Sequence, residues 1–330
     1  MSRTHRKKRR PLPLKQVLFS ALAVLAALFV LILLNEALGS GLPLPGTDDV
    51  MNGLGGLYEK AGLSPAAVTR AEGELAVHYV DVGQADCELI QTPEQNVLID
   101  AGDVGGGDAV AAYLKAQGVE RIDLLIATHP HADHIGGMAD VVNQFEIGKV
   151  LFAEVPRLLT PTSKTYERLL DAIADKDLKV AKAQPGIKYD LGGGAMLTVL
   201  GPMDEYRDDL NENSVVCRLD FGETSFLFTG DASRQSENDL VKAYGDGLSA
   251  DVLKLGHHGS DTSSQEKWLN AVDPEVAVCC VGWDNTYGHP NPEVLERLEK
   301  RGVTLYRTDR NGTVVVTSDG EQLAVQTEKS

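Results

Sequence analysis

The chain has 330 residues, of which 43% are hydrophobic and 24% charged, an ordinary balance for a folded protein. Its first fifteen residues hold seven of the 31 Lys and Arg and no acids, so the remainder has 24 basic against 48 acidic residues, a net charge of −24. This charge excludes nonspecific nucleic-acid binding through a broadly basic surface, although two divalent ions would create a local positive site.

The N-terminus combines a basic segment with a long apolar one. Six Lys and Arg lie in residues 3–10, and the span 14–34 that follows has no charge from Val17 to Leu34. As a helix this span is about 30 Å long, enough to cross a bilayer. We therefore expect a cytoplasmic tail over 1–13, one transmembrane helix, and the rest of the chain outside the cytoplasmic membrane. A cleaved signal peptide is the alternative and would give a secreted protein.

The rest of the chain predicts a stalk followed by a single domain. Residues 35–74 are rich in Gly, Pro and small residues, which is typical of a spacer. Over residues 75–330, antiparallel strands come first and a strand-helix alternation is then repeated in two halves. This order predicts an α/β fold with two packed sheets and helices on both outer faces.

The expected strands are 75–82, 86–91, 96–100, 123–128, 149–153, 196–200, 215–220, 225–229, 252–255, 276–281, 303–306 and 313–317, and the expected helices are 108–117, 136–144, 163–176, 233–244, 263–271 and 291–301. Ser263 and Glu266 have the spacing of a capping box at the start of the fifth helix. Asn311-Gly312 and Asp319-Gly320 are typical of hairpin turns.

The segment 129–134, His-Pro-His-Ala-Asp-His, is the strongest functional signal. Imidazole nitrogens and carboxylate oxygens are ligands of divalent ions such as zinc. In a tight loop that leaves a strand, His129 and His131 can converge on one ion while Asp133 and His134 face a second. The alternative, histidines that only cap a helix, would require three uncommon residues to cluster without a ligand role.

This loop resembles the H-x-H-x-D-H signature of the metallo-β-lactamase superfamily. Within the superfamily the chain is most similar to the hydrolase domain of ComEC-type DNA-uptake proteins and their free-standing relatives, over about residues 75–328. The segments that carry the superfamily resemblance are, besides the loop, 97–102, 226–231 and 253–260, and those that carry the ComEC likeness are 80–87, 257–260, 288–290 and 306–312.

The resemblance implies an αββα sandwich with two metal ions at one edge between the sheets. It makes Asp231 the carboxylate that bridges the ions and places a late histidine ligand at the doublet His257-His258. Asp100, which ends the first motif, is expected to hold a metal-bound histidine from behind or to cap its own loop. Zn²⁺ is the metal we expect first, and Mn²⁺ is the alternative.

One departure from the family pattern concerns a missing ligand. Many members carry another histidine shortly before the strand that leads to the bridging Asp, whereas residues 210–216 contain none. Either the first ion has one protein ligand fewer, or His257 and His258 each serve one ion. The second option requires the doublet to lie in a turn, because neighbours on a strand point to opposite faces. Gly256 and Gly259 favour such a turn.

Catalytic roles follow from the chemistry of two ions, which lower the pKa of a shared water, so that hydroxide is available, and polarise a phosphoryl or carbonyl oxygen. Asp133 is expected to orient the nucleophile or accept its proton. His289, in a Gly- and Pro-rich loop, is a candidate contact for a substrate phosphate or leaving group, or else an ordinary loop histidine. Asn213 and Ser214 are candidates for hydrogen bonds to substrate oxygens.

The four cysteines lie in apolar, strand-like segments with no C-x-x-C spacing. They are expected to be buried small hydrophobes rather than members of a disulfide framework. A metal-ligand role for Cys217 is the alternative. The cysteines are Cys87, Cys217, Cys279 and Cys280.

We therefore expect a membrane-tethered metallohydrolase that cleaves phosphodiesters in extracellular nucleic acid or in an envelope polymer such as teichoic acid. Hydrolysis of a β-lactam or another small ester or amide is the enzymatic alternative. A non-catalytic, metal-binding component of an uptake or envelope assembly is the other, although the retained ligands argue against it. ComEC-type proteins join this domain to a multi-helix channel, which one apolar span cannot form without partner proteins.

Overall fold

The computed structural model describes residue 68, residues 70–283 and residues 285–329. The predicted cytoplasmic tail, the transmembrane helix 14–34 and most of the stalk lie outside these residues. Within the described part of the chain, no helix is both long and apolar enough to span a membrane.

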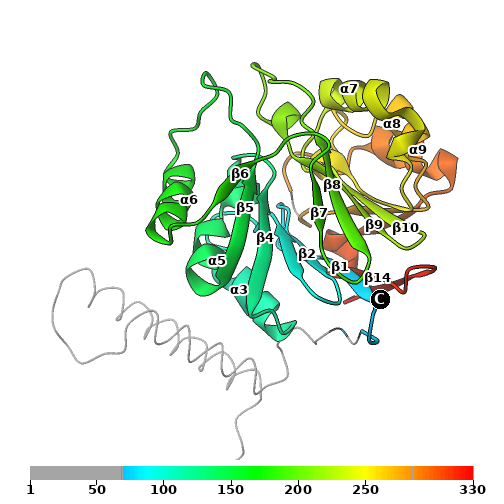
Figure 1. Ribbon diagram of the computed structural model, residues 1–330. Coiled ribbons are helices and arrows are strands. Elements are labelled where there is room, and N and C mark those ends of the chain that lie inside the picture. Colours follow the sequence, from blue (N-terminus) through cyan, green and yellow to red (C-terminus); the bar gives the residue numbers. More distant parts are fainter. Residues whose placement is uncertain (1–67, 69, 284, 330) are drawn as a thin grey trace, which may run out of the picture. The chain divides into compact units, whose positions relative to one another are not determined.

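Two β-sheets pack face to face, and helices cover both outer surfaces (Figure 1). The first sheet has the order β15-β14-β1-β2-β3-β4-β5-β6 and the second β13-β12-β11-β10-β9-β8-β7. Strands of the first sheet are β1 (Leu75–Tyr79), β2 (Glu88–Gln91), β3 (Asn96–Ile99), β4 (Arg121–Ala127), β5 (Glu146–Phe152), β6 (Val180–Lys182), β14 (Val314–Ser318) and β15 (Leu323–Thr327). Strands of the second are β7 (Lys188–Asp190), β8 (Ala195–Gly201), β9 (Val216–Phe221), β10 (Thr224–Phe228), β11 (Val252–Lys254), β12 (Val276–Cys279) and β13 (Thr304–Arg307).

The helices form one outer layer on each sheet, so the predicted αββα sandwich is confirmed (Figure 1). The first sheet is covered by α3 (Gly107–Ala116), α5 (Met138–Gln144) and α6 (Lys164–Asp175), and the second by α7 (Arg234–Tyr244), α8 (Glu266–Val272) and α9 (Pro292–Arg301).

Alternation along the strands produces three apolar layers from one chain. In β3, Val97 and Ile99 pack between the sheets, whereas Leu98 packs under the helices of the first sheet. In β10, Phe226 and Phe228 also lie between the sheets, and Leu227 lies under the helices of the second. Each such side chain stabilises the fold by about 1.5–3 kcal/mol when it is fully buried.

Parallel strands bring the functional loops together. Strands β3 to β6 run parallel in the first sheet, and β10 to β13 run parallel in the second. The carboxyl ends of parallel strands lie at one edge of a sheet, which is where α/β proteins place their binding sites. The loops at these ends contain Asp100 after β3, residues 129–134 after β4, Asp231 after β10, the doublet His257-His258 after β11 and His289 after β12.

Two local predictions were wrong. Ser263 does not cap α8, which begins at Glu266. Its hydroxyl donates to the carbonyl of Ala232 at 2.8 Å instead. Asn311-Gly312 does not form a hairpin, because β13 and β14 belong to different sheets and the short helix α10 (Thr308–Asn311) connects them. The turn at Asp319-Gly320 is confirmed by the antiparallel pairing of β14 with β15.

Candidate metal centre

The first group of candidate ligands consists of His129, His131 and Asp231, which offer atoms within 4.8 Å of one another. His129 Nε2 lies only 2.9 Å from His131 Nδ1, so the two rings point at a common position. His129 is fully buried, and its Nδ1 faces the hydroxyls of Thr128 at 3.1 Å and Ser214 at 3.3 Å. These contacts leave Nε2 directed toward the group.

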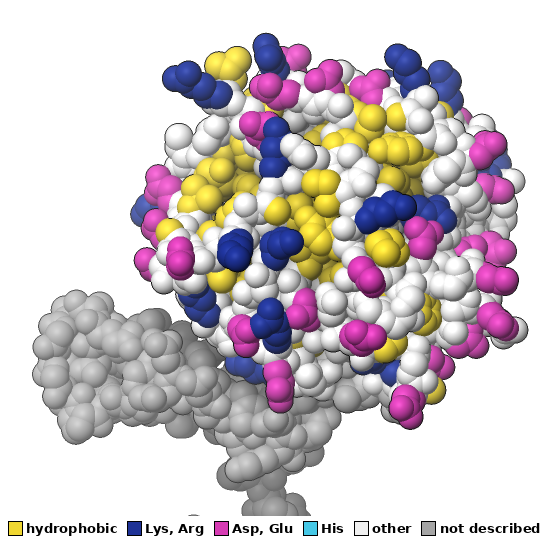
Figure 2. Space-filling view, in the orientation of Figure 1, with side chains coloured by type: hydrophobic (Ala, Val, Ile, Leu, Met, Phe, Trp, Pro, Cys, Tyr) yellow, Lys and Arg dark blue, Asp and Glu magenta, His cyan; other side chains and the backbone are white. Residues whose placement is uncertain are grey.

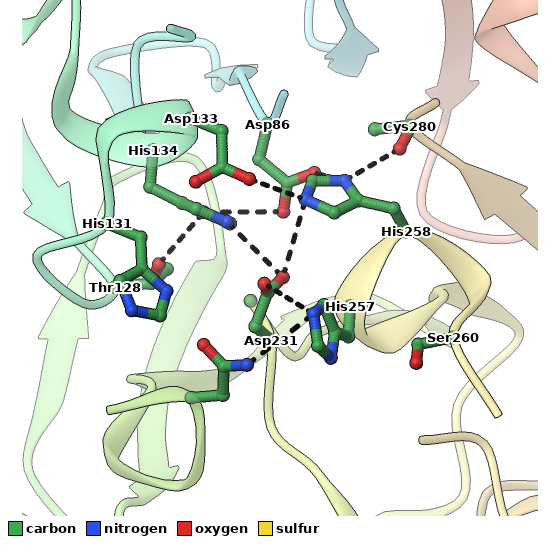
Figure 3. A network of polar contacts seen from close by, with 12 residues as sticks. Asp86, Thr128, His131, Asp133, His134, Asp231, His257, His258, Ser260 and Cys280 are labelled. Carbon is green, nitrogen blue, oxygen red and sulfur yellow. Dashed lines mark hydrogen bonds and ion pairs between the residues drawn. The ribbon is translucent and has the colours of Figure 1, made fainter. Parts of the chain in front are cut away.

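The second group consists of Asp133, His134, Asp231 and His258, again with ligand atoms within 4.8 Å (Figure 3). His258 Nε2 lies 3.3 Å from Asp133 Oδ2. Among the described residues, His134 Nε2, His258 Nε2 and Asp231 Oδ1 are buried without a hydrogen-bond partner. Buried polar atoms without partners are costly, so three of them directed at one another fit a divalent cation between them.

Asp231 stands between the two groups, with one carboxylate oxygen toward each. Oδ1 lies 3.3 Å from His134 Nε2 and 3.8 Å from His258 Nε2. Oδ2 lies 3.9 Å from His129 Nε2 and 3.7 Å from His257 Nε2. The carboxylate is therefore placed where a bridge between two ions has to be.

The histidine doublet lies in a tight turn with two consecutive left-handed residues. His257 has φ 50° and ψ 48°, and His258 has φ 51° and ψ 26°. The turn directs His257 toward Oδ2 of Asp231 and His258 toward Oδ1. Each ring is held from behind, His257 by the Thr262 hydroxyl at 3.1 Å and His258 by the Cys280 carbonyl at 2.9 Å.

Asp100 holds His134 from behind. Its Oδ2 lies 2.7 Å from His134 Nδ1, and Thr128 donates to both carboxylate oxygens, from its backbone N–H at 2.9 Å and its hydroxyl at 2.6 Å. A carboxylate in this position fixes the tautomer and orientation of a metal-binding imidazole. Asp100 also has a left-handed backbone, with φ 55°.

Two charged residues at the site escaped the sequence reasoning. Asp86 and Lys254 are fully buried and form an ion pair beneath the second group, and Lys254 also donates to the Gly230 carbonyl at 3.2 Å. Asp86 Oδ1 lies 3.2 Å from His258 Nδ1. Burial alone would raise the pKa of Asp86, but Lys254 and His258 outweigh it and lower this pKa to about 2. For Lys254 the available signal was a single charge inside the apolar run 252–255, whereas Asp86 lies in a polar segment that gave no such signal.

The carboxylates give the centre an excess of negative charge. Burial disfavours the protonated form of His258, yet Asp231 and Asp86 raise its pKa to about 10. Against the same effect of burial, Asp231 and Asp100 raise the pKa of His134 well above its usual value. A site that stabilises imidazolium ions in this way also stabilises divalent cations, which displace those protons.

His289 lies beside the first group rather than in it. Its ring centroid is 5.6 Å from that of His257, and its Nδ1 is buried without a partner in the described part of the chain. Burial, then the charges of His257 and His258, lower the pKa of His289 to about 4. A neutral ring with a free nitrogen is able to donate to or accept from a bound substrate.

The other sequence candidates have structural contacts. The Asn213 amide binds the backbone around Tyr206 and Asp209, with Nδ2 donating to their carbonyls at 2.7 and 2.8 Å. Ser214 is fully buried, lies 3.3 Å from His129 Nδ1 and accepts from the Asp231 backbone N–H at 3.1 Å. Ser214 thus supports candidate ligands and Asn213 holds its loop, and their hydrogen bonds to substrate oxygens stay a prediction.

All four cysteines are buried and free, as predicted. Cys217 packs between the sheets and belongs to no candidate ligand group among the described residues. Cys280 does belong to one, with Asp86 and Glu88. Lys254, ion-paired with Asp86, already supplies a cation there.

A two-sheet sandwich with adjacent His and Asp groups at one edge defines the class of metal-dependent hydrolases. A model of the metallo-beta-lactamase superfamily matches residues 80–283, and the chain belongs to that superfamily.

Three proteins within reach of sequence comparison are similar to this chain. ComE operon protein 3 of Bacillus subtilis is 28% identical over 262 residues, covering 74% of this chain and 33% of the relative. Competence protein ComA of Neisseria gonorrhoeae is 34% identical over 248 residues, covering 74% and 32%. Recombination protein 2 of Haemophilus influenzae is 29% identical over 255 residues, covering 76% and 30%. The resemblance to ComEC-type proteins is confirmed, and the matched segment spans about a third of each relative.

Proposed function

We propose that the protein is a dinuclear metallohydrolase that cleaves phosphodiester bonds outside the cytoplasmic membrane. The observation that carries the dinuclear reading is Asp231, whose two oxygens face two different sets of imidazoles. We assign His129, His131 and His257 to the first ion, and Asp133, His134 and His258 to the second, with Asp231 between them. Zn²⁺ suits imidazole-rich sites best, and Mn²⁺ is the alternative.

When bound, the two ions would activate water and neutralise charge on the substrate. The residues of the chain have separate tasks. Asp133 keeps a third of its side chain exposed, in contrast to the buried Asp231. It is therefore the carboxylate that we assign to accept a proton from the attacking water. His289 would bind a substrate oxygen or the leaving group from the side of the first ion.

Support for a phosphodiester substrate comes from the relatives, two of which are named for competence or recombination. Single-stranded DNA is our first candidate, and a phosphodiester polymer of the envelope is the second. Figure 2 shows one face, on which basic side chains are scattered among acidic and apolar ones rather than joined in a band. Because the chain beyond residue 15 has 24 basic against 48 acidic residues, binding of a polyanion would depend on the ions.

Membrane attachment rests on the sequence of residues 1–34, with its basic segment before a long apolar span. The hydrolase domain would stand outside, anchored through one helix or released if the segment is cleaved. There it would meet incoming nucleic acid and envelope polymers, and channel proteins are candidate partners.

Full-length protein in detergent, loaded with Zn²⁺ or Mn²⁺, tests the function against single-stranded DNA, bis-p-nitrophenyl phosphate and nitrocefin. We expect cleavage of the first two, abolished by EDTA and by Asp231→Asn. Hydrolysis of nitrocefin alone would favour the ester and amide alternative. Two bound ions without turnover on any substrate would favour a non-catalytic component, and failure to retain two ions would refute the dinuclear centre.

A further inference from the structure

A buried carboxamide lies beside the first group, in the segment where the sequence lacks a histidine. Asn211 belongs to the short 3-10 helix η1 (Asn211–Asn213), which precedes β9. The residue is only 8% exposed. Its Nδ2 lies 3.5 Å from His257 Nε2, and its Oδ1 is buried with no hydrogen-bond partner among the described residues.

These contacts leave the amide without a structural task. The backbone of Asn211 is fixed, since its N–H donates to Asp209 Oδ1 at 2.9 Å and its carbonyl accepts from Ser214 N–H at 3.0 Å. The side chain adds one long contact to an imidazole nitrogen. A buried acceptor without a partner is destabilising, so an amide kept here needs a ligand to offset that cost.

The distances match neighbouring ligands around one ion. Donor atoms bound at about 2.1 Å lie about 3.0–3.4 Å apart when they occupy adjacent positions of an octahedron or tetrahedron. The Asn211 amide and His257 Nε2 are 3.5 Å apart, and His257 Nε2 and Asp231 Oδ2 are 3.7 Å apart. Half a turn about the Cβ–Cγ bond exchanges the amide nitrogen for its oxygen and presents an acceptor to the same position.

We propose that Asn211 is a ligand of the first ion through its side-chain carboxamide oxygen. This inference rests on the proposed function, because it presupposes an ion in the first group. It adds a neutral oxygen to the nitrogens of His129, His131 and His257. Amide oxygens suit harder ions such as Mn²⁺, and imidazole suits Zn²⁺. With Asn211 as a ligand, the first site would bind its ion more weakly than the second site does and would be less selective for Zn²⁺.

Metal titration of the full-length protein tests this assignment without relying on activity. The variants are Asn211→Leu, which removes the donor at similar size, Asn211→Asp, which keeps an oxygen, and Asn211→His. Asn238→Leu is the matched control, because Asn238 is exposed on α7 and donates only to the Arg234 carbonyl. Calorimetry and elemental analysis give affinity and stoichiometry for Zn²⁺ and Mn²⁺.

Wild type, Asn238→Leu and Asn211→Asp should each bind two ions. Asn211→Leu should keep the second ion and lose at least about tenfold in affinity for the first, since loss of a supporting partner alone costs about 10–100-fold. Asn211→His should raise the preference of the first site for Zn²⁺ over Mn²⁺. If Asn211→Leu does not fold, Asn211→Ser, whose hydroxyl is too short to reach the ion, carries the same expectation.

Two outcomes would overturn the assignment. One is an Asn211→Leu protein that binds both ions with wild-type affinity. The other is unchanged metal binding with a raised KM, which would make the amide a substrate contact. Wild-type protein that binds fewer than two ions would instead refute the dinuclear centre itself, and the two failures are therefore distinguishable.

Discussion

Two consecutive non-glycine residues with a left-handed backbone are unusual, because this conformation costs each of them about 1–2 kcal/mol. His257 and His258 both adopt this conformation. The neighbouring Gly259, with φ 80°, completes the turn. The strain has a clear geometric result, since it sends adjacent imidazoles to opposite oxygens of Asp231. Strained backbone of this kind is typical of functional sites.

We predict that the two histidines of the doublet serve different ions. His257→Ala should lower the affinity for the first ion, and His258→Ala the affinity for the second. We expect each loss to be about 10–100-fold or more. Elemental analysis after dialysis against metal-free buffer, followed by titration, measures the loss. If either variant keeps two ions at wild-type affinity, that histidine has only a structural role.

The buried ion pair gives a second prediction at this scale. Lys254→Met removes the cation paired with Asp86 and leaves this buried carboxylate with only the partial compensation from His258, which should cost up to about 3–5 kcal/mol of unfolding free energy. The double variant Lys254→Met with Asp86→Asn removes both charges of the pair and should recover much of that loss. Urea unfolding of both proteins makes the comparison. Equal stability of the single and double variants would contradict the pairing.

Sequence reasoning found the candidate ligands that lie in family motifs and missed residues whose roles depend only on contacts in space. Residues 129–134 form one continuous motif, so its three histidines and its aspartate are recognised together. Asp86 and Lys254, by contrast, are joined only because the loop after β1 packs against the end of β11. Asn211 also carried no local signal, since an asparagine in a polar segment is ordinary. Its role depends on the position of His257, 46 residues later in the chain.

At the scale of elements, the predicted helix 136–144 corresponds to α5, which begins two residues later, and a short helix that was not predicted precedes it. The structure has α4 (Ala132–Ile135), which carries Asp133 and His134, and α5 (Met138–Gln144). Between them, Gly136 and Gly137 pack against the loop that follows β3. A Cβ on Gly137 would lie 2.3 Å from the Ala101 carbonyl oxygen. The glycines allow the ligand loop to touch the loop of Asp100.

Gly137→Ala should therefore displace the metal loop. Gly137 has φ −89°, which alanine adopts freely, so the effect comes from the clash alone. We expect a loss of about 1–3 kcal/mol in unfolding free energy, together with weaker metal binding. Gly247→Ala is the control, because its Cβ would meet only the Tyr244 Cβ, at 3.8 Å. Equal effects of the two substitutions would show that the close approach is unimportant.

The contact between β1 and α3 predicts a pH dependence of stability. His78 lies 2.8 Å from the Tyr113 hydroxyl, and burial, then the charge of Arg70, lower the pKa of His78 from 6.5 to about 4. Between these values the unfolded chain binds a proton that the folded chain does not. The contribution of His78 to stability should thus be lost as pH falls from 6.5 to about 4. Urea unfolding of wild type and His78→Asn should show a steeper loss for wild type; parallel curves would contradict it.

Most strands and helices were predicted within a few residues, because buried strands such as β10 contain apolar runs and amphipathic helices such as α6 have clear periodicity. The three strands that were missed, β6, β7 and β15, are all edge strands. All three alternate between partly buried and exposed residues, and β6 and β7 have only three residues each. The crossing from β13 to β14 was also unpredictable, since no local pattern says that the chain changes sheets.

At the scale of the whole molecule, orientation in the membrane remains a prediction from residues 1–34. Protease added to intact protoplasts should digest the hydrolase domain and leave the N-terminal segment protected. A cytoplasmic marker protein that stays intact is the control. A protected hydrolase domain would contradict the orientation and remove extracellular polymers from the substrates that we propose.

Both candidate ion positions take ligands from loops of both sheets, His129 and His134 from the first and Asp231 from the second. Bound ions would therefore cross-link the two halves of the sandwich at this edge. The sheets could not separate there without releasing metal, and metal could not leave without some separation. The rate at which a chelator removes the ions would then measure how often the sandwich opens, a motion that no static structure records.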